Sequence, residues 1–143
     1  MTQQKSVHLL EVGEELEPLK FIPTAELNQQ YLYGVEDYNP LYIEGDHAYV
    51  HPSLLLNMSN FTRSPSYYLD PQFGAIHAAE ETIFVHPATI GKTITVSWKV
   101  TDAYPKRGRP YQEIAVSVVD EDGQEILRRI KSVTYSSIEL AIK

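Results

Sequence analysis

The feature that most constrains the fold of this chain is the alternation of apolar and polar side chains within residues 92–104. Thr, Ser and Lys side chains separate the apolar positions, which are Ile94, Val96, Trp98 and Val100. A period of two with β-branched residues is typical of a strand that has one buried face. We therefore predict a strand over residues 92–104 whose apolar face contributes to a core.

Three other runs in residues 76–138 also predict strands, and they cover residues 77–86, 111–120 and 124–137. The connections at 105–108 and 121–123 are short, and the second contains Asp122-Gly123, a pair that readily supplies positive φ. Successive long strands joined by short turns pair antiparallel. We predict that the second half of the chain is a four-stranded antiparallel meander.

The first half of the chain predicts two helices. Thr24 is the expected N-cap of the first, which carries an apolar stripe and ends between residues 34 and 37. The second helix begins at Pro52, because the fixed φ of proline suits a first helical turn. The stripe of the first helix is Leu27, Tyr31 and Val35, and the apolar residues from the second helix onward are Leu54, Leu55, Met58 and Phe61.

The second helix is apolar over more than one face, which predicts that it is buried. A sheet with one apolar face must be covered by another element. We predict that this helix covers the sheet, which gives an α+β fold in a single domain over residues 1–143. With 43% apolar and 22% charged residues, the chain has an ordinary globular composition.

Charge and residue usage exclude several classes of function. A net charge of −7 disfavours binding to nucleic acid. The sequence has no cysteine, which excludes disulfides, thiolate nucleophiles and thiolate metal sites. We expect no metal ion and no cofactor. Because the N-terminal residues include no long apolar run, we also expect no membrane segment and a cytoplasmic location.

The stretch most informative about chemistry runs from Asp37-Tyr38-Asn39-Pro40-Leu41-Tyr42 to His51-Pro52-Ser53. Its first part resembles the Asp-x-Asn-Pro-x-His signature of the MaoC-like (R)-specific enoyl-CoA hydratases and dehydratases, which are lyases of fatty acid metabolism. The resemblance extends over residues 6–138 and implies a hotdog fold, in which an antiparallel sheet wraps around one central helix. The strand region resembles the family at His77, Glu80, Glu81, His86-Pro87, Gly91, Gly108 and Gly123.

In that family an Asp and a His position water and move its proton, and a backbone N–H at a helix start holds the thioester oxygen. The resemblance places Asp37 at the position of the catalytic Asp. Tyr42 stands at the position of the His, and a free tyrosine, with a pKa of about 10, is a poor base at neutral pH. Pro52 stands where the family has Gly, and proline has no N–H to donate.

These two departures affect two separate catalytic functions, so the resemblance implies an accessory chain. Such a chain shapes the site for an acyl-CoA or acyl-carrier thioester and pairs with a catalytic hotdog chain, in a homodimer or heterodimer. An active (R)-hydratase with Asp37 and Tyr42 as its catalytic residues is one alternative. An acyl-CoA thioesterase or a non-enzymatic binding module is another. The residues that we expect to contact the substrate are Asn39, His51, Ser53 and Tyr67.

Several of these residues also have a plainer interpretation. Asn39 is a good turn former, His51 can cap the second helix, and Tyr67 can pack in a loop with its hydroxyl in water. The basic run at residues 106–109 is either a solvated hairpin tip or a contact for phosphate. His77 and His86 are separated by an odd number of positions on one predicted strand, so they are not expected to share a metal.

Overall fold

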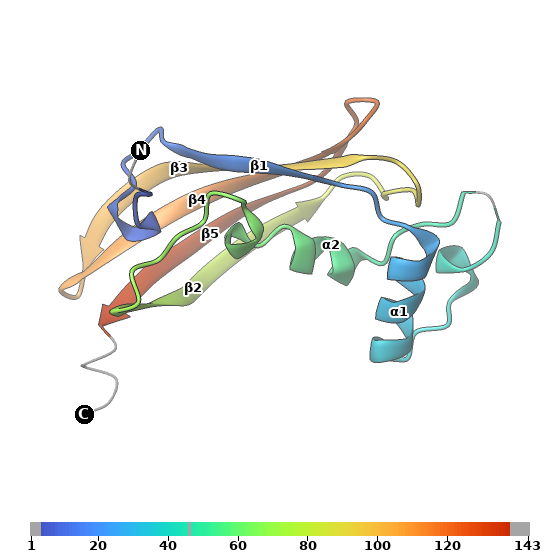
Figure 1. Cartoon of the computed structure of the whole chain (residues 1–143), viewed down its shortest axis with the longest axis horizontal. Coiled ribbons are helices and arrows are strands. Elements are labelled where there is room, and N and C mark those ends of the chain that lie inside the picture. Colours follow the sequence, from blue (N-terminus) through green and yellow to red (C-terminus); the bar gives the residue numbers. More distant parts are fainter. Residues whose placement is uncertain (1–3, 46, 138–143) are drawn as a thin grey trace.

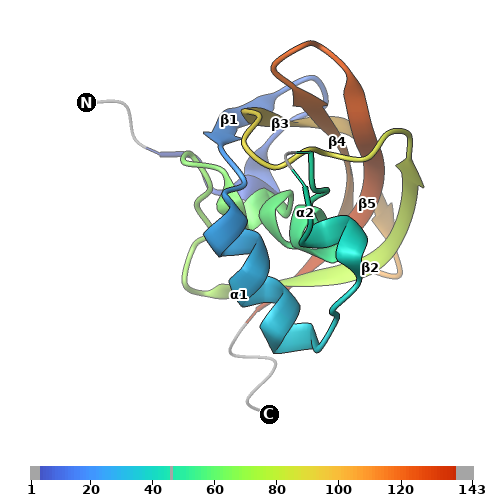
Figure 2. The ribbon, with the colours of Figure 1, turned by 90° about the vertical axis from the view of Figure 1, so that its right-hand side faces the viewer.

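The computed structural model describes residues 4–45 and 47–137, and a curved five-stranded antiparallel sheet is its main element. The strands are β1 (Glu15–Phe21), β2 (Phe73–Phe84), β3 (Ile94–Lys106), β4 (Arg109–Asp120) and β5 (Glu125–Ser137). The helices are α1 (Ala25–Val35) and α2 (Pro52–Met58), with 3-10 turns at Val7–Leu9, Pro40–Tyr42 and Phe61–Arg63. The sheet curls around α2, as Figures 1 and 2 show, so the predicted α+β hotdog architecture is confirmed.

The strand order is β1-β3-β4-β5-β2, which corrects the predicted meander in one respect. β3, β4 and β5 follow one another as predicted, but β2 pairs with β5 and not with β3. Adjacent strands lie about 4.8 Å apart, and the connection at 85–93 is long enough to pass β5 and β4 and reach β3. The two edges of the sheet are therefore β1 and β2.

β1 is the strand that sequence analysis missed. Its alternation is interrupted at Pro18, and its pairing with β3 shifts register between Leu16 and Leu19. Proline is tolerated in strands chiefly at edges and bulges, where a missing N–H breaks no ladder. Leu16 is buried in the core and Leu19 packs against it, although three positions separate them, because the register shifts between these two residues.

The boundaries of the other strands differ from the prediction at their ends. The β3–β4 turn consists of Arg107 and Gly108, both with positive φ, so the strands extend further toward the hairpin tip than predicted. β2 begins at Phe73 and ends before His86, and its register shifts between His77 and Ala79. The premise that His77 and His86 stand on one regular strand is therefore wrong, so their spacing does not assign them to faces of the sheet.

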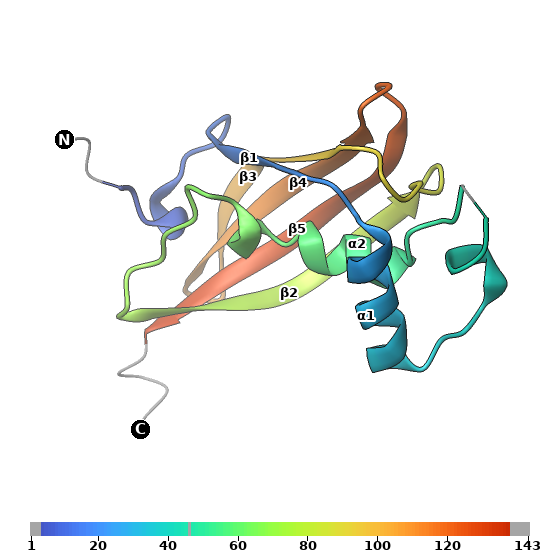
Figure 3. The ribbon, with the colours of Figure 1, turned by 45° about the vertical axis from the view of Figure 1, so that its right-hand side comes forward.

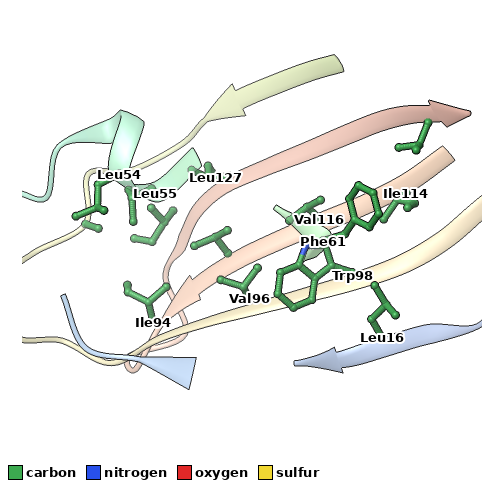
Figure 4. Packing of buried hydrophobic residues seen from close by; sticks show 14 of the residues in the cluster. Leu16, Leu54, Leu55, Phe61, Ile94, Val96, Trp98, Ile114, Val116 and Leu127 are labelled. Carbon is green, nitrogen blue, oxygen red and sulfur yellow. The ribbon is translucent and has the colours of Figure 1, made fainter. Parts of the chain in front are cut away.

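α2 is the central helix, and its apolar side packs on the concave face of the sheet (Figure 4). Leu54 and Leu55 are buried there, as predicted. Burying a side chain of this kind contributes about 1.5–3 kcal/mol. The predicted apolar faces of β3 and β4 form the floor of the core, and its members include Ile94, Val96, Trp98, Val100, Ile114, Val116 and Val118.

α1 lies across the end of the sheet, near the start of α2 (Figure 3). Thr24 caps it as predicted, because its hydroxyl accepts a hydrogen bond from the N–H of Leu27. Leu27 and Tyr31 of the predicted stripe pack against the core, but Val35 is exposed, and the fully buried positions of α1 are Asn28 and Leu32. Within the described ranges no helix is long and apolar enough to cross a membrane.

Candidate functional site

Two predicted site residues, Asp37 and His51, meet at the start of α2. His51 is the N-cap of α2, and its Nε2 lies 3.1 Å from Oδ2 of Asp37. The side chains are 15% and 35% exposed respectively, so the imidazole is mostly shielded from water while the carboxylate remains accessible. The loop that carries Asp37 therefore abuts the N-terminal end of the central helix, as the resemblance implied.

The end of α1 determines where Asp37 lies. Glu36 adopts the left-handed conformation at φ 55°, which ends the helix and turns the chain. Asp37 Oδ1 then accepts a hydrogen bond from the N–H of Asn39 at 3.1 Å, which leaves Oδ2 directed at His51. Asn39 Oδ1 accepts from the N–H of Leu41 at 3.0 Å, so Asn39 acts here as the turn former that caps the following 3-10 turn.

The hydrogen bonds of His51 assign its tautomer. Nδ1 lies 3.1 Å from the backbone nitrogen of Ser53 and accepts its N–H, so the proton of a neutral imidazole is on Nε2. Nε2 donates that proton to Asp37 Oδ2. His51 therefore both caps α2 and binds Asp37, and both ring nitrogens are engaged within the chain.

Asn28 holds the site together, and sequence analysis did not identify it. Its Nδ2 donates to the carbonyl oxygens of Tyr42 and Tyr49, each at 3.1 Å, and its Oδ1 accepts from the N–H of His51 at 3.0 Å. Asn28 is 1% exposed. The sequence does contain one signal for the burial of Asn28. It lies four residues before the apolar Leu32, a spacing that places both residues on one side of α1.

Tyr42, which stands at the position of the family's His, lies beside His51. Their ring centroids are 5.1 Å apart, and the ring of Tyr31 on α1 lies 5.4 Å from the same imidazole. Both rings help to exclude water from His51. The residue that contacts the Asp37 carboxylate is thus His51, while Tyr42 lines the site through its ring.

The start of α2 presents no free backbone donor in its first three residues. Pro52 has no N–H, the N–H of Ser53 is bound to Nδ1 of His51, and the N–H of Leu54 is bound to the carbonyl of His51 at 3.0 Å. A helix start normally offers several free N–H groups. At the start of α2 these N–H groups are not free, because proline has none and the capping histidine binds the next one.

Tyr67 does not join this group. It belongs to the segment between α2 and β2, which runs away from α1 (Figure 1), and its ring meets Phe61 edge-on at 5.4 Å. Burial raises the pKa of Tyr67 above its usual value. The plainer interpretation of Tyr67, loop packing, describes these contacts.

The basic hairpin tip is also remote from Asp37 and His51. It lies at the end of the sheet opposite α1 (Figure 1). Lys106 Nζ lies 5.6 Å from the ring centroid of Tyr111, which in turn stacks on Tyr104. A hollow of about 440 Å³ beside the tip is lined by residues that include His8, Tyr104, Arg109 and Tyr111.

A larger hollow of about 600 Å³ lies on the outer face of the sheet, away from α2. Small side chains of β3 and β4 form its floor, and charged side chains form its rim. Because it lies on the face opposite to α2, it does not contain the Asp37–His51 pair. Its lining includes Ser97, Lys99, Ala115, Ser117, Arg128 and Ile130.

A second polar cluster, which no sequence pattern indicated, lies at the C-terminal end of α2. Arg129 on β5 donates to the carbonyl of Leu56 and to Oγ of Ser59, and it forms an ion pair with Glu80 on β2. Lys131, two positions further along β5, donates to Oδ1 of Asn60. Both cations face α2, although charged residues on a strand are usually solvated.

No protein-family model matches this sequence, and a search of curated proteins found no match. Solved structures do resemble it. The monoamine oxidase regulatory protein from Archaeoglobus fulgius aligns over 87% of this chain and 90% of its own, with 19% identity and a TM-score of 0.75. The MaoC-like dehydratase from Rhodospirillum rubrum aligns over 92% and 97%, with 16% identity and a TM-score of 0.75.

A third similar structure is a complex, the C-terminally truncated 3R-hydroxyacyl-ACP dehydratase from Mycobacterium tuberculosis. It aligns over 92% of this chain and 99% of its own, with 12% identity and a TM-score of 0.68. At these identities the likeness concerns the fold. The predicted resemblance is confirmed at that level: this chain has the hotdog fold that MaoC-like dehydratases share.

Proposed function

We propose that this chain is the accessory member of a hotdog pair that binds an acyl thioester, and that its partner carries the hydratase or dehydratase chemistry. The observation that carries this proposal is the closed hydrogen-bond arrangement around His51. Asp37 and Ser53 occupy both nitrogens of that imidazole, at the start of a helix with no free backbone donor in its first turn.

Hydration of an enoyl thioester needs a base, an acid and a donor for the thioester oxygen. Asp37 and His51 have the chemical character of a base and an acid, and a solvent-accessible carboxylate is available to a ligand. The start of α2 does not supply this donor, because the N–H groups at positions 53 and 54 are bound internally. The loss of one such donor typically costs a factor of about 10²–10³ in rate. A chain with this site is better suited to binding than to turnover.

A partner chain is supported by the exposed edge of β2. This strand is 12 residues long, and within the described residues it pairs with β5 along one side only. A long edge strand is a liability unless another chain pairs with it or covers it. A second hotdog chain added there would continue the sheet. The exposed apolar residues on or next to β2 are Ile76, Ile83, Phe84 and Val85.

An active (R)-hydratase is the second candidate function. The contact between Asp37 and His51 favours it in a modified form, in which His51 replaces Tyr42 as the proton donor. In this candidate, an oxyanion donor must come from the partner chain or from a side chain. The two candidates therefore differ in whether the chain turns over substrate by itself.

The test compares binding and turnover by the isolated full-length chain. We expect hexanoyl-CoA to bind in isothermal titration calorimetry, and we expect hex-2-enoyl-CoA to remain unchanged until a catalytic hotdog partner is added. Turnover by the isolated chain that Asp37→Asn abolishes, and that the exposed control Asp102→Asn retains, would establish the active hydratase. Release of free CoA would indicate a thioesterase, and a complete lack of binding would refute both candidates.

A further inference from the structure

Two cations are buried on the inner side of β5, which is unusual for a sheet face that forms a core. Arg129 and Lys131 are each 4% exposed, and their neighbours on the same face of the strand, Leu127 and Val133, are apolar and buried. Burial of a charge is costly unless the charge is paired and hydrogen-bonded. Each cation therefore needs an explanation.

Arg129 is explained by contacts within the chain. Its guanidinium forms an ion pair with Glu80 and donates to Leu56 O at 2.8 Å and to Ser59 Oγ at 2.6 Å. These bonds attach the end of α2 to the sheet, and the negative end of the helix favours a cation there. Burial by itself would raise the pKa of Glu80, but the hydrogen bond and charge of Arg129 hold it below the usual value.

Lys131 is not explained in this way. An ammonium group has three donors, and its partner in the described residues is the neutral side chain of Asn60. Glu80 lies opposite Lys131 in the β2–β5 register, but its carboxylate is in contact with Arg129, and no described carboxylate forms an ion pair with Lys131. Burial and the charge of Arg129 lower the pKa of Lys131 to about 8, and the nearby charge of Glu80 opposes this shift without cancelling it. The cluster thus holds a net charge of +1 when Lys131 is protonated.

The position of Lys131 relates it to the candidate site. Asp37 and His51 lie at the N-terminal end of α2, and Asn60 lies just beyond its C-terminal end. The seven residues of α2 span about 10 Å. Lys131 lies on the buried face of β5, the strand that pairs with the edge strand β2. A molecule that contacts Asp37 at one end and follows α2 would reach Lys131 with its other end.

We propose that Lys131 binds a carboxylate at the far end of the acyl group, so that the preferred ligand is a thioester of a dicarboxylic acid. This inference rests on the proposed function and specifies its substrate class. A hydrocarbon end placed against Lys131 and Asn60 would remove both from water and return no hydrogen bond. A carboxylate instead supplies the missing counter-ion in a charge-assisted hydrogen bond.

The experiment uses matched pairs of saturated thioesters that differ in one terminal group. Hexanoyl-CoA is compared with adipoyl-CoA, and octanoyl-CoA with suberoyl-CoA, by titration calorimetry on the full-length protein. Because a hydrogen bond to a charged group is strong, we expect the dicarboxylic member of one pair to bind roughly 10- to 100-fold more tightly. The acyl-chain length that shows the greatest preference indicates the distance between the bound thioester and Lys131.

Three variants establish which residue causes the preference. Lys131→Met is expected to abolish it, and Lys131→Gln, which retains a donor for Asn60, is expected to abolish it as well. Lys99→Met is the matched control, since Lys99 is an exposed lysine that lines the hollow on the outer face of the sheet, and it is expected to keep the preference. Thermal unfolding confirms that each variant is folded.

The outcomes separate this inference from the proposed function. If both members of every pair bind equally, the carboxylate inference is wrong while the acyl-thioester function stands. If neither member binds, the proposed function itself is wrong. If Lys131→Met changes the oligomeric state in analytical ultracentrifugation and leaves the ligand preference intact, the counter-ion of Lys131 belongs to a second chain and the inference is overturned.

Discussion

Replacing Lys131 by methionine should stabilise this protein at neutral pH. Methionine retains most of the side-chain volume and removes a buried charge that forms no ion pair with a described carboxylate, so the desolvation cost of that charge disappears. The pKa of Lys131 falls from 10.5 to about 8 on folding. At about 1.4 kcal/mol per pKa unit, this shift corresponds to an upper limit of about 3 kcal/mol.

The pH dependence of this effect has a definite sign. Below pH 8 Lys131 is protonated in both the folded and the unfolded state, so the cost of burying its charge is fully present. Between about pH 8 and 10.5 the unfolded state binds more protons than the folded state, and the stability of the wild type rises relative to the variant. Above pH 10.5 the cost has disappeared. The stability gap between the two proteins should therefore close as the pH rises.

Urea unfolding followed by circular dichroism, at one fixed protein concentration, measures this gap at pH 7, 8, 9 and 10. The other groups near Lys131, namely Arg129 on β5 and Glu80 and His77 on β2, are present in both proteins, so their titration largely cancels in the difference. Lys99→Met serves as the control and should show no gap that closes with pH. A Lys131→Met protein that is less stable at pH 7, or a gap that does not change with pH, would refute the reasoning.

Three other changes test the contacts described above. Arg129→Met should destabilise the protein by about 3 kcal/mol in urea unfolding, because it removes two charged hydrogen bonds to Leu56 O and Ser59 Oγ, whereas the exposed control Arg128→Met should have little effect. Asn28→Ala removes three hydrogen bonds and should lower the free energy of unfolding by about 3 kcal/mol. In ¹⁵N NMR this variant should also show a mixture of His51 tautomers. A single unchanged tautomer would contradict the role of Asn28 in positioning His51. Ile83→Lys introduces a charge next to the open β2 edge and should shift size-exclusion elution toward the monomer, and an unchanged elution volume would place the partner elsewhere.

The regular parts of the fold were predictable because burial on one face leaves a clear pattern. β3 and β4 alternate strictly, and each of the predicted apolar positions is buried. β1 escaped prediction because Pro18 and the bulge disturb its alternation. The position of β2 beside β5 was not predictable either, since a connection as long as 85–93 permits pairing at more than one edge.

The candidate site was predictable as a set of residues but not as a set of contacts. Asp37 and His51 were both identified, yet their pairing depends on the turn at Glu36. This residue has a left-handed backbone conformation, which no local sequence pattern predicts for a glutamate. Asn28 and Lys131 were missed as buried residues because a polar residue within an apolar periodicity looks like a solvent-facing one. Only the surrounding packing reveals which of them is buried.

The central helix explains why polar groups gather at two places in an otherwise apolar core. Burying α2 removes both of its ends from water, so each end must find hydrogen-bond partners. His51 and Pro52 serve the N-terminal end, while Arg129 and Trp98 serve the C-terminal end, where Trp98 Nε1 donates to Ser59 O at 2.8 Å. These four residues have structural partners within the chain. Asp37 keeps an accessible carboxylate although it binds His51, and Lys131 is a buried ammonium with which no described carboxylate forms an ion pair. These two are therefore the groups that we expect a ligand to contact.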